Sequence, residues 1–227
     1  MNAELSRQTP DNEQFPLASE APLASKPIGL KGRLSARLMT WVHGAEYRAV
    51  AETLKIGPTD RLVEIGCGAG YFLRTYGAIA AAVAGLDHSP DMVTLAGRQN
   101  RHRAAAGKAD IRQGDAGHLP WGDGQFTTAA AIATFLFWPE PLQALREVHR
   151  VLSPGGRLAI GLGWNADDGV DHRAHVKKHG IRLYSGREMK TLFAEAGFTD
   201  ISIRYFKAFM EPKGMVASAV KPDVAKE

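Results

Sequence analysis

The sequence is poor in cysteine, which limits the chemistry it can support. Its 227 residues include one cysteine, Cys67, so an internal disulfide and a zinc site built from several cysteines are excluded. No apolar run approaches the roughly 18 residues that a membrane-spanning helix needs. The first residues, MNAELSRQTPDNEQ, lack the basic start and apolar stretch of a signal peptide. We therefore expect a cytoplasmic protein without a membrane span.

An excess of charge of one sign is also missing. Lys and Arg number 28 and Asp and Glu 24, which gives a formal net charge of +4. This charge is too small to indicate nucleic acid binding by itself. Hydrophobic residues make up 44% of the chain and charged residues 23%, as in ordinary globular proteins. The length suits one α/β domain with a substantial core.

The first residues differ in composition from the rest. Residues 1–30 are rich in proline, serine, alanine and acids and show little periodicity, so we expect a mobile arm. The alternative is an arm that folds over a bound substrate. Apolar residues then recur at helical spacing, which predicts helices over 32–55. We expect a single domain over 31–227, with its core in 56–221.

Strand and helix patterns alternate after residue 55. Strands are predicted at 61–66, 81–86, 109–113, 126–133 and 157–162, and helices at 69–78, 90–105 and 139–152. This order predicts a parallel sheet covered on both faces. A helix follows over about 185–197, where Ser185 and Glu188 have the spacing of a capping box. The last two strands, TDISIRYF and GMVASAVKP, have a short connection and must pair antiparallel.

The stretch LVEIGCGAGYF contains the clearest candidate binding loop. Gly66, Gly68 and Gly70 follow an apolar strand and open a helix, so backbone N–H groups reach the carboxyl edge of the sheet. Nucleotide-like cofactors bind such loops, and NAD expects G-x-G-x-x-G. Here Tyr71 occupies the position of the third glycine, which disfavours NAD. A purely structural turn is the alternative.

Two acids support a nucleotide site at the same edge. Asp87 ends the second strand, 21 residues after Gly66, where a carboxylate can accept hydrogen bonds from both ribose hydroxyls. Asp115 follows the third strand, where it can accept the exocyclic amine of an adenine. The structural alternatives are a helix N-cap for Asp87, a role that Ser89 already suits, and a turn residue for Asp115.

Four segments in order, VEIGCGAG, GLDHSPDMV, GDAGHLPWGDGQF and REVHRVLSPGGRLAI, resemble class I S-adenosylmethionine-dependent methyltransferases. The resemblance covers about residues 55–221 and is strongest to the small-molecule type that includes quinone-biosynthesis enzymes. It implies an α/β fold with a doubly wound, Rossmann-like sheet of seven strands, mostly parallel with an antiparallel final strand. It also implies S-adenosylmethionine as cofactor, and helices over 32–55 that cover the active site.

The resemblance also implies which residues contact S-adenosylmethionine. The matched residues are Glu64, Gly66, Gly68, Gly70, Asp87, His88, Met92, Asp115 and Ala116. The first four would line the methionine end, and Asp87 would hold the ribose. Asp115 and the backbone of Ala116 would read the adenine, whose faces His88 and Met92 would cover. Core packing is the alternative for Met92.

One position departs from the family pattern. The family usually has Phe-Asp before the fourth strand, whereas here Phe126 is followed by Thr127. The Asp of that pair is normally distant from the methyl group. The departure therefore puts local stability in question more than catalysis.

The segment after the fourth strand narrows the acceptor class. ATFLFWPEP stands where amino-base methyltransferases carry Asn/Asp-Pro-Pro-Tyr, and no Pro-Cys nucleophile for cytosine is present. Thr134, Phe135 and Trp138 suggest an apolar wall for a small organic acceptor with an O, N, S or C centre. Core burial is the alternative, above all for Phe135.

The catalytic residues stay open. A sulfonium methyl is already activated, so positioning the acceptor can suffice, and an alcohol or carbon acid also needs a general base. The candidate bases are His43, Tyr47 and His175.

The segment DHRAHVKKHG places three histidines at helical spacing, His172, His175 and His179. It is a solvated basic connector, a lid that grips an anionic acceptor, or a metal site, which the adjacent cations disfavour. We expect no metal.

The leading hypothesis is methyl transfer to a small molecule. The alternatives are a non-catalytic cofactor-binding regulatory module, an NAD-dependent oxidoreductase and an RNA methyltransferase, whose sign would be salt-dependent RNA binding. A nucleic acid partner is not expected, and the oligomeric state is open.

Overall fold

The computed structural model describes residues 43–208 and 211–223. The expected arm over 1–30 and the first part of the expected helices over 32–55 lie outside the described residues. No helix in the described part of the chain is both long and apolar enough to cross a membrane.

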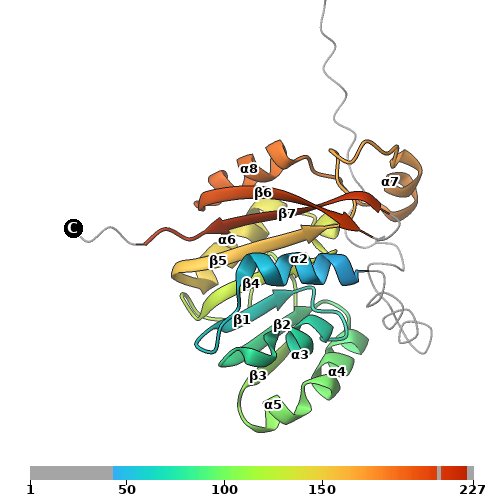
Figure 1. The fold of residues 1–227 in the computed structure, drawn as a ribbon. Helices are drawn as coiled ribbons and strands as arrows, with labels where there is room; N and C mark the ends of the chain where they lie inside the picture. Colours follow the sequence, from blue (N-terminus) through green and yellow to red (C-terminus); the bar gives the residue numbers. More distant parts are fainter. Residues whose placement is uncertain (1–42, 209–210, 224–227) are drawn as a thin grey trace, which may run out of the picture.

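The described strands form one seven-stranded sheet in the order β3-β2-β1-β4-β5-β7-β6 (Figure 1). The strands are β1 Arg61–Ile65, β2 Ala82–Asp87, β3 Ala109–Gln113, β4 Phe126–Ile132, β5 Leu152–Leu162, β6 Thr199–Ala208 and β7 Glu211–Val220. The pairs among β1 to β5 are parallel, and β7 is antiparallel to both of its neighbours, β5 and β6. The predicted fold class, with its antiparallel final strand, is confirmed.

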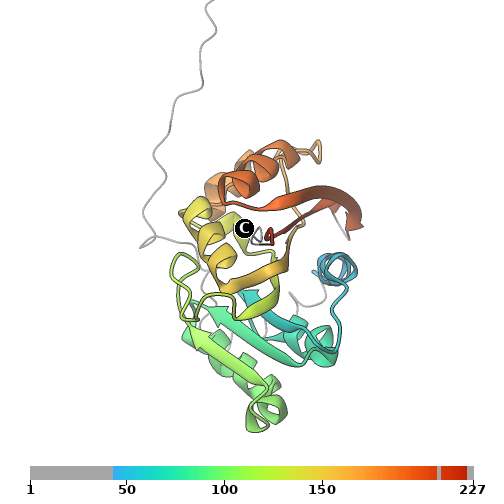
Figure 2. The same ribbon diagram turned by 90° about the vertical axis from the view of Figure 1, so that its left-hand side faces the viewer.

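Helices cover both faces of the sheet, as Figure 2 shows for α2 on one side and α6 and α8 on the other. The helical segments are α2 Gly44–Leu54, α3 Tyr71–Thr75, η2 Gly77–Ile79, α4 Pro90–Gln99, α5 Arg101–Ala105, η3 Phe135–Phe137, α6 Pro141–Val151, α7 Arg173–His179 and α8 Gly186–Glu195. This arrangement leaves the carboxyl ends of the parallel strands at one edge of the sheet, where ligands bind in such folds.

The two faces have separate hydrophobic cores, and β1 contributes to both. Val63 and Ile65 pack in the core under α6 and α8, whereas Leu62 packs in the core under α2 and α3. Side chains alternate between the faces of a strand, so Glu64 lies on the same face as Leu62. A carboxyl group is therefore placed inside an otherwise apolar layer.

Several predicted boundaries differ in informative ways. The predicted helix over 90–105 breaks at Asn100, whose side-chain amide donates to the carbonyl groups of Gly70 and Ala96 at 3.3 and 3.0 Å. The predicted helix over 139–152 ends at Val151, and β5 begins at Leu152, so it includes SPGG and starts before the predicted strand over 157–162. This segment can join the sheet because Gly155 and Gly156 exchange backbone hydrogen bonds with Lys221, at 2.9 and 2.8 Å.

Local predictions from side-chain spacing hold closely. Ser185 accepts a hydrogen bond from the Glu188 N–H, and the Glu188 carboxylate accepts the Ser185 N–H at 2.8 Å, which completes the capping box. The position that departs from the family pattern is also well bonded. Thr127 donates its hydroxyl to Asp60 at 2.7 Å and accepts the Arg61 N–H at 2.9 Å. Threonine therefore ties β4 to β1 there.

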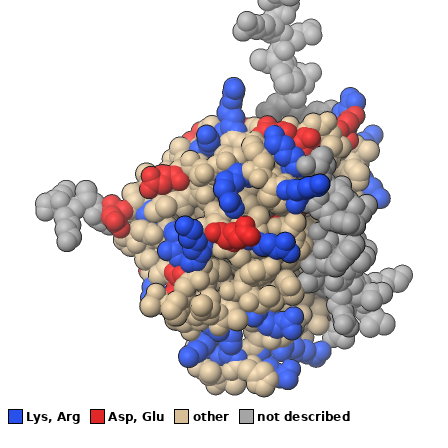
Figure 3. Space-filling view, viewed as in Figure 1, with Lys and Arg blue, Asp and Glu red and all other residues tan. Residues whose placement is uncertain are grey.

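Basic side chains gather over α4 and α5, at the β3 edge of the sheet (Figure 3). Arg98, Arg101 and Lys108 are exposed there. Arg103 instead donates to the carbonyl groups of Ala78 and Ala80, at 2.8 and 2.7 Å. Part of this basic run therefore holds the fold together.

Candidate functional site

The glycine loop follows β1 at the carboxyl edge of the sheet. Gly66, Gly68 and Gly70 have φ angles of +74°, +50° and +78°, in the left-handed region that glycine adopts readily. A Cβ on Gly66 would also lie 2.6 Å from the Cβ of Thr134 and 2.8 Å from its Cγ2, whereas one on Gly68 would meet open space. The loop is anchored to β2, because the N–H groups of Gly66 and Cys67 both donate to the Leu86 carbonyl, at 2.7 and 2.9 Å.

Asp87, at the end of β2, supports this loop directly. One carboxylate oxygen accepts the Gly68 N–H at 2.8 Å, and the other accepts the Ser89 N–H at 2.9 Å. The residue is 7% exposed. Each carboxylate oxygen has a further lone pair, so Asp87 can hold the loop and still accept a ligand hydroxyl.

Glu64 lies beneath the same loop and is only 2% exposed. Its Oε2 atom has no hydrogen-bond partner among the described residues. Burial, and then the negative charge of Asp87, raise the pKa of Glu64 well above its usual value, and the Leu73 N–H opposes this rise. Buried polar atoms are normally hydrogen-bonded, so this atom fits a ligand that brings its own donor, such as an amino group.

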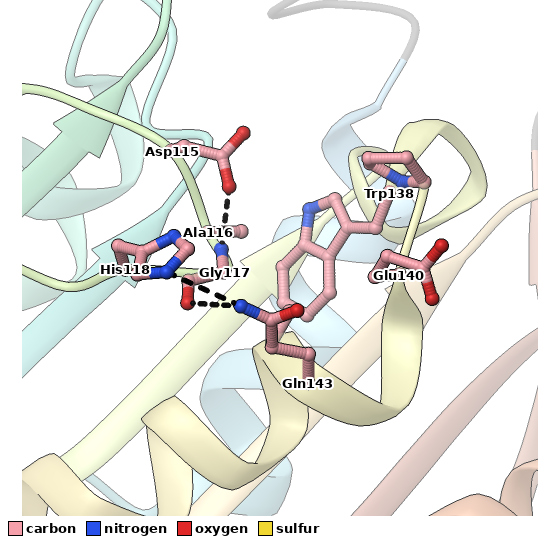
Figure 4. Close-up of a pocket in the computed structure, with 9 residues that line it drawn as sticks. Asp115, Ala116, Gly117, His118, Trp138, Glu140 and Gln143 are labelled. Carbon is pink, nitrogen blue, oxygen red and sulfur yellow. Dashed lines mark hydrogen bonds between the residues drawn. The ribbon is translucent and has the colours of Figure 1, made fainter. Parts of the chain in front are cut away.

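Asp115 borders a cavity of about 190 Å³ between the loop after β3 and the start of α6 (Figure 4). One of its oxygens accepts the Gly117 N–H at 2.7 Å, as a turn aspartate does. The Trp138 ring forms the opposite wall, and Gln143 closes the floor by donating to the Gly117 carbonyl at 3.1 Å. The cavity is smaller than the roughly 300–1,000 Å³ of typical ligand pockets, so it suits one ring system.

The predicted adenine neighbours differ in exposure. The His88 side chain is 41% exposed, with Nδ1 3.7 Å from an Asp87 oxygen. Met92 is 2% exposed, so it packs in the interior, the alternative that the sequence left open.

The predicted acceptor wall does not form one surface. Thr134 contacts the glycine loop, whereas Trp138 shares the cavity with Asp115. Phe135 is fully buried between Trp138 and Tyr184, with ring centroids 4.8 and 4.9 Å away. Phe135 is therefore a core residue, because the 3-10 turn that follows β4 directs its ring into the hydrophobic core beside the sheet.

The three candidate bases have unequal surroundings. Tyr47 packs against Tyr71 with ring centroids 5.2 Å apart. Burial, followed by the charges of Glu64 and Glu46, raises the Tyr47 pKa, so the phenol keeps its proton at neutral pH. His43 Nδ1 lies 3.0 Å from a Glu46 oxygen. The exposed His175 ring lies 4.8 Å from Trp164.

An acid–histidine pair that the sequence analysis missed lies after β5. Asp168 and His172 have side chains 1% and 7% exposed, and the carboxylate lies 2.7 Å from His172 Nε2. The signal was present as an acid and a histidine four residues apart, but no apolar pattern marked the pair as buried.

The loop that leads to this pair is hydrogen-bonded to the rest of the fold. Asn165 is fully buried and donates to the Lys213 carbonyl at 2.6 Å, and Asp167 accepts the Gly186 N–H and the Tyr205 hydroxyl, both at 2.6 Å. These partners come from β6, β7 and α8, far away in the sequence. The segment DHRAHVKKHG that follows is mostly exposed, with His172 buried, as a solvated connector would be. Across residues 43–208 and 211–223, His, Cys, Asp and Glu form no group of three suited to a metal ion.

A family model described as a methyltransferase domain matches residues 63–160, which include the glycine loop, Asp87 and Asp115. Over these residues the chain carries a methyltransferase domain, and the resemblance to class I S-adenosylmethionine-dependent methyltransferases is confirmed. The matched range contains the glycine loop after β1, Asp87 at the end of β2 and Asp115 after β3, the residues on which the sequence resemblance rests.

Curated proteins similar to this chain include an O-methyltransferase of Penicillium expansum, 28% identical over 174 residues, which cover 73% of this chain and 61% of that protein. A 2-phytyl-1,4-naphtoquinone methyltransferase of Synechococcus elongatus is 31% identical over 130 residues, 56% of each chain. The chain spans 50%, 40% and 61% of the first three curated relatives.

Solved structures share the fold. A methyltransferase of Thermotoga maritima, described as a possible histamine N-methyltransferase, aligns with a TM-score of 0.65 at 23% identity, covering 83% of this chain and 95% of that one. At this identity the likeness supports the fold of the methyltransferase.

Proposed function

We propose that this methyltransferase transfers a methyl group from S-adenosylmethionine to a small organic acceptor. One observation carries the proposal. Three carboxyl groups, Glu64, Asp87 and Asp115, come from β1, from β2 and from the loop after β3, which are neighbours in the sheet, and the first two adjoin the glycine loop. S-adenosylmethionine supplies the methyl group, already activated on its sulfonium.

Each carboxyl group has a distinct role in the proposal. The unpartnered Glu64 oxygen receives the cofactor amino group, and Asp87 receives the ribose hydroxyls. The second oxygen of Asp115 and the backbone of Ala116 read the adenine at the cavity. His88 covers the exposed side of the base. Met92 supports this region from the interior.

On the acceptor side, we assign Thr134 and the segment after β5. Thr134 is half-buried against the glycine loop, and Trp164 provides an aromatic face beside His172 and His175. The relatives that are O-methyltransferases or quinone methyltransferases support a partly aromatic or apolar acceptor.

A hydroxyl acceptor would give the Asp168–His172 pair a chemical role. If Nε2–H of His172 donates to the buried Asp168, the unprotonated nitrogen is Nδ1. A carboxylate that accepts this hydrogen bond holds the ring in one orientation and one tautomer. His172 is therefore a further candidate base beside His43, Tyr47 and His175.

The decisive experiment is calorimetric titration with S-adenosylhomocysteine, with NAD run in parallel. Micromolar affinity corresponds to about −8 kcal/mol and is readily measured. Binding of S-adenosylhomocysteine alone is the expected result, and binding of NAD alone would reassign the loop to an oxidoreductase.

Transfer of a labelled methyl group to quinols, phenols, amines and thiols then tests activity. Cofactor binding without transfer to these compounds or to cell extract would favour the non-catalytic module. Labelling of RNA that weakens steeply with salt would favour the RNA enzyme. The exposed Arg98, Arg101 and Lys108 keep that second candidate open.

A further inference from the structure

We propose that Glu64 holds a proton while the cofactor site is free and releases it when a ligand with a positively charged amino group binds. This inference rests on the proposed function, because it concerns the same cofactor. It adds a coupling between ligand binding and proton release that depends on one buried side chain.

The position of Glu64 gives its carboxyl group few ways to be stabilised. The side chain points from β1 into the apolar layer under α2 and α3, and the residue is 2% exposed. Its Oε2 has no hydrogen-bond partner among residues 43–208 and 211–223. An isolated buried carboxylate is costly, and such a group normally takes up a proton or gains a cationic partner.

The neighbouring titratable groups favour the proton. Asp87 on β2 places a like charge beside Glu64, and burial and that charge both raise the Glu64 pKa. Two of the groups facing Glu64 are Tyr47 of α2 and Cys67 of the loop, and both have raised pKa values, so both stay neutral. Asp87 accepts two backbone N–H groups, so the proton is better placed on Glu64.

Two histidines lie beside carboxylates other than Glu64. His88 lies 3.7 Å from an Asp87 oxygen, and His43 lies 3.0 Å from Glu46 on α2. Glu46 acts on Tyr47 and not directly on Glu64. These histidines lie beside other carboxylates, so they do not supply the cation that Glu64 lacks.

An incoming ammonium group replaces the proton. The free carboxyl group ionises, its proton leaves to solvent, and the carboxylate pairs with the ligand's NH₃⁺. The Glu64 pKa is therefore higher in the free site than in the bound site. Between these two pKa values, affinity rises by up to about tenfold per pH unit, and above the higher value it is constant.

The test is titration calorimetry of the full chain with S-adenosylhomocysteine in buffers of different ionisation enthalpy. The slope of the observed enthalpy against the buffer enthalpy counts protons. We expect the release of about one proton at pH values between the bound-site and free-site pKa of Glu64. 5′-Methylthioadenosine, which lacks the amino acid, should bind without proton release. Glu64→Gln, whose amide resembles the protonated acid, should bind S-adenosylhomocysteine with no proton release and no pH dependence.

Each outcome is decisive. Binding of S-adenosylhomocysteine without proton release, or equal release with 5′-methylthioadenosine, overturns the inference and leaves the proposed function standing. Release that persists in a folded Glu64→Gln variant assigns the proton to another group, such as His88. If that variant does not fold, the two ligands still decide the question with the unaltered protein. Failure of both ligands to bind overturns the cofactor site as well.

Discussion

The tightest packing in the glycine loop is the contact between Gly66 and Thr134, and it predicts different costs for two similar substitutions. Gly66→Ala and Gly68→Ala each place a methyl group on a residue with positive φ, at +74° and +50°. Only the first new methyl collides, because the Cβ and Cγ2 of Thr134 lie 2.6 and 2.8 Å from its position. The contact involves the Thr134 Cβ itself, so a change of rotamer cannot relieve it.

The expected costs combine backbone strain with steric overlap. A left-handed backbone costs a residue with a Cβ roughly 1–2 kcal/mol, which is the whole expected loss for Gly68→Ala. Forcing extra atoms into a packed region typically adds about 1–3 kcal/mol. We therefore expect Gly66→Ala to lower the free energy of unfolding by about 2–5 kcal/mol.

Urea denaturation without ligand, followed by circular dichroism, measures both losses. Thr134→Gly removes the three atoms nearest to the new methyl group. In that background Gly66→Ala should cost no more than Gly68→Ala does in the unaltered protein. Equal losses for the two alanine variants, or no relief in the Thr134→Gly background, would refute the reasoning from packing.

Three further predictions concern charge, capping and ligand binding. Asp60→Asn breaks the 2.8 Å ion pair with Arg157 and should lower the free energy of unfolding at pH 7 by about 1–3 kcal/mol. Burial raises the Asp60 pKa, but hydrogen bonds and the Arg157 charge outweigh burial, so the folded-state pKa is lowered overall. The stability from this ion pair is therefore fully present above the unfolded-state pKa of about 3.9. It is lost as the pH falls through the lower pKa of the folded state. Ser185→Ala breaks the capping box with Glu188 and should cost about 1 kcal/mol in thermal or urea unfolding. Asp87→Ala should weaken S-adenosylhomocysteine binding by roughly 1.5–3 kcal/mol in calorimetry.

Matched variants separate these effects from general damage. Ser185→Thr retains a capping hydroxyl and should stay close to the unaltered protein. Asp87→Asn keeps one acceptor for the loop while removing the charge, so unchanged affinity in both Asp87 variants would remove this residue from the site. A difference between the unaltered protein and Asp60→Asn that stays constant from pH 7 down through the acid transition would contradict the assignment of the Asp60 pKa.

Local features were predictable wherever neighbouring residues in the chain carry them. The apolar run before Gly66 predicted β1, and the spacing of Ser185 and Glu188 predicted the capping box. The short connection after TDISIRYF required an antiparallel pair, as β6 and β7 form. Strand boundaries were less predictable, because SPGG is part of β5 through hydrogen bonds to the distant residue Lys221.

In the candidate site, too, the sequence predicted the residue types, whereas their contacts and burial depend on distant residues. The family motifs marked Asp87 and Asp115, but not that Asp87 holds the Gly68 N–H and has little exposure. Sequence alone left Phe135 open between an acceptor wall and the core, and three-dimensional packing decided for the core. The buried Asp168 and His172 were missed because their burial depends on the surrounding fold.

The sequence by itself therefore determined the fold class, the glycine loop and the order of the acids along the chain. Those features follow from periodicity, backbone freedom and side-chain chemistry, which act over a few residues. The tertiary structure decided which polar groups lose water and which partners replace it. Glu64 is an acid in any conformation, but only the packing of α2 and α3 on its face of the sheet makes it a buried carboxyl group with an unpartnered oxygen among the described residues.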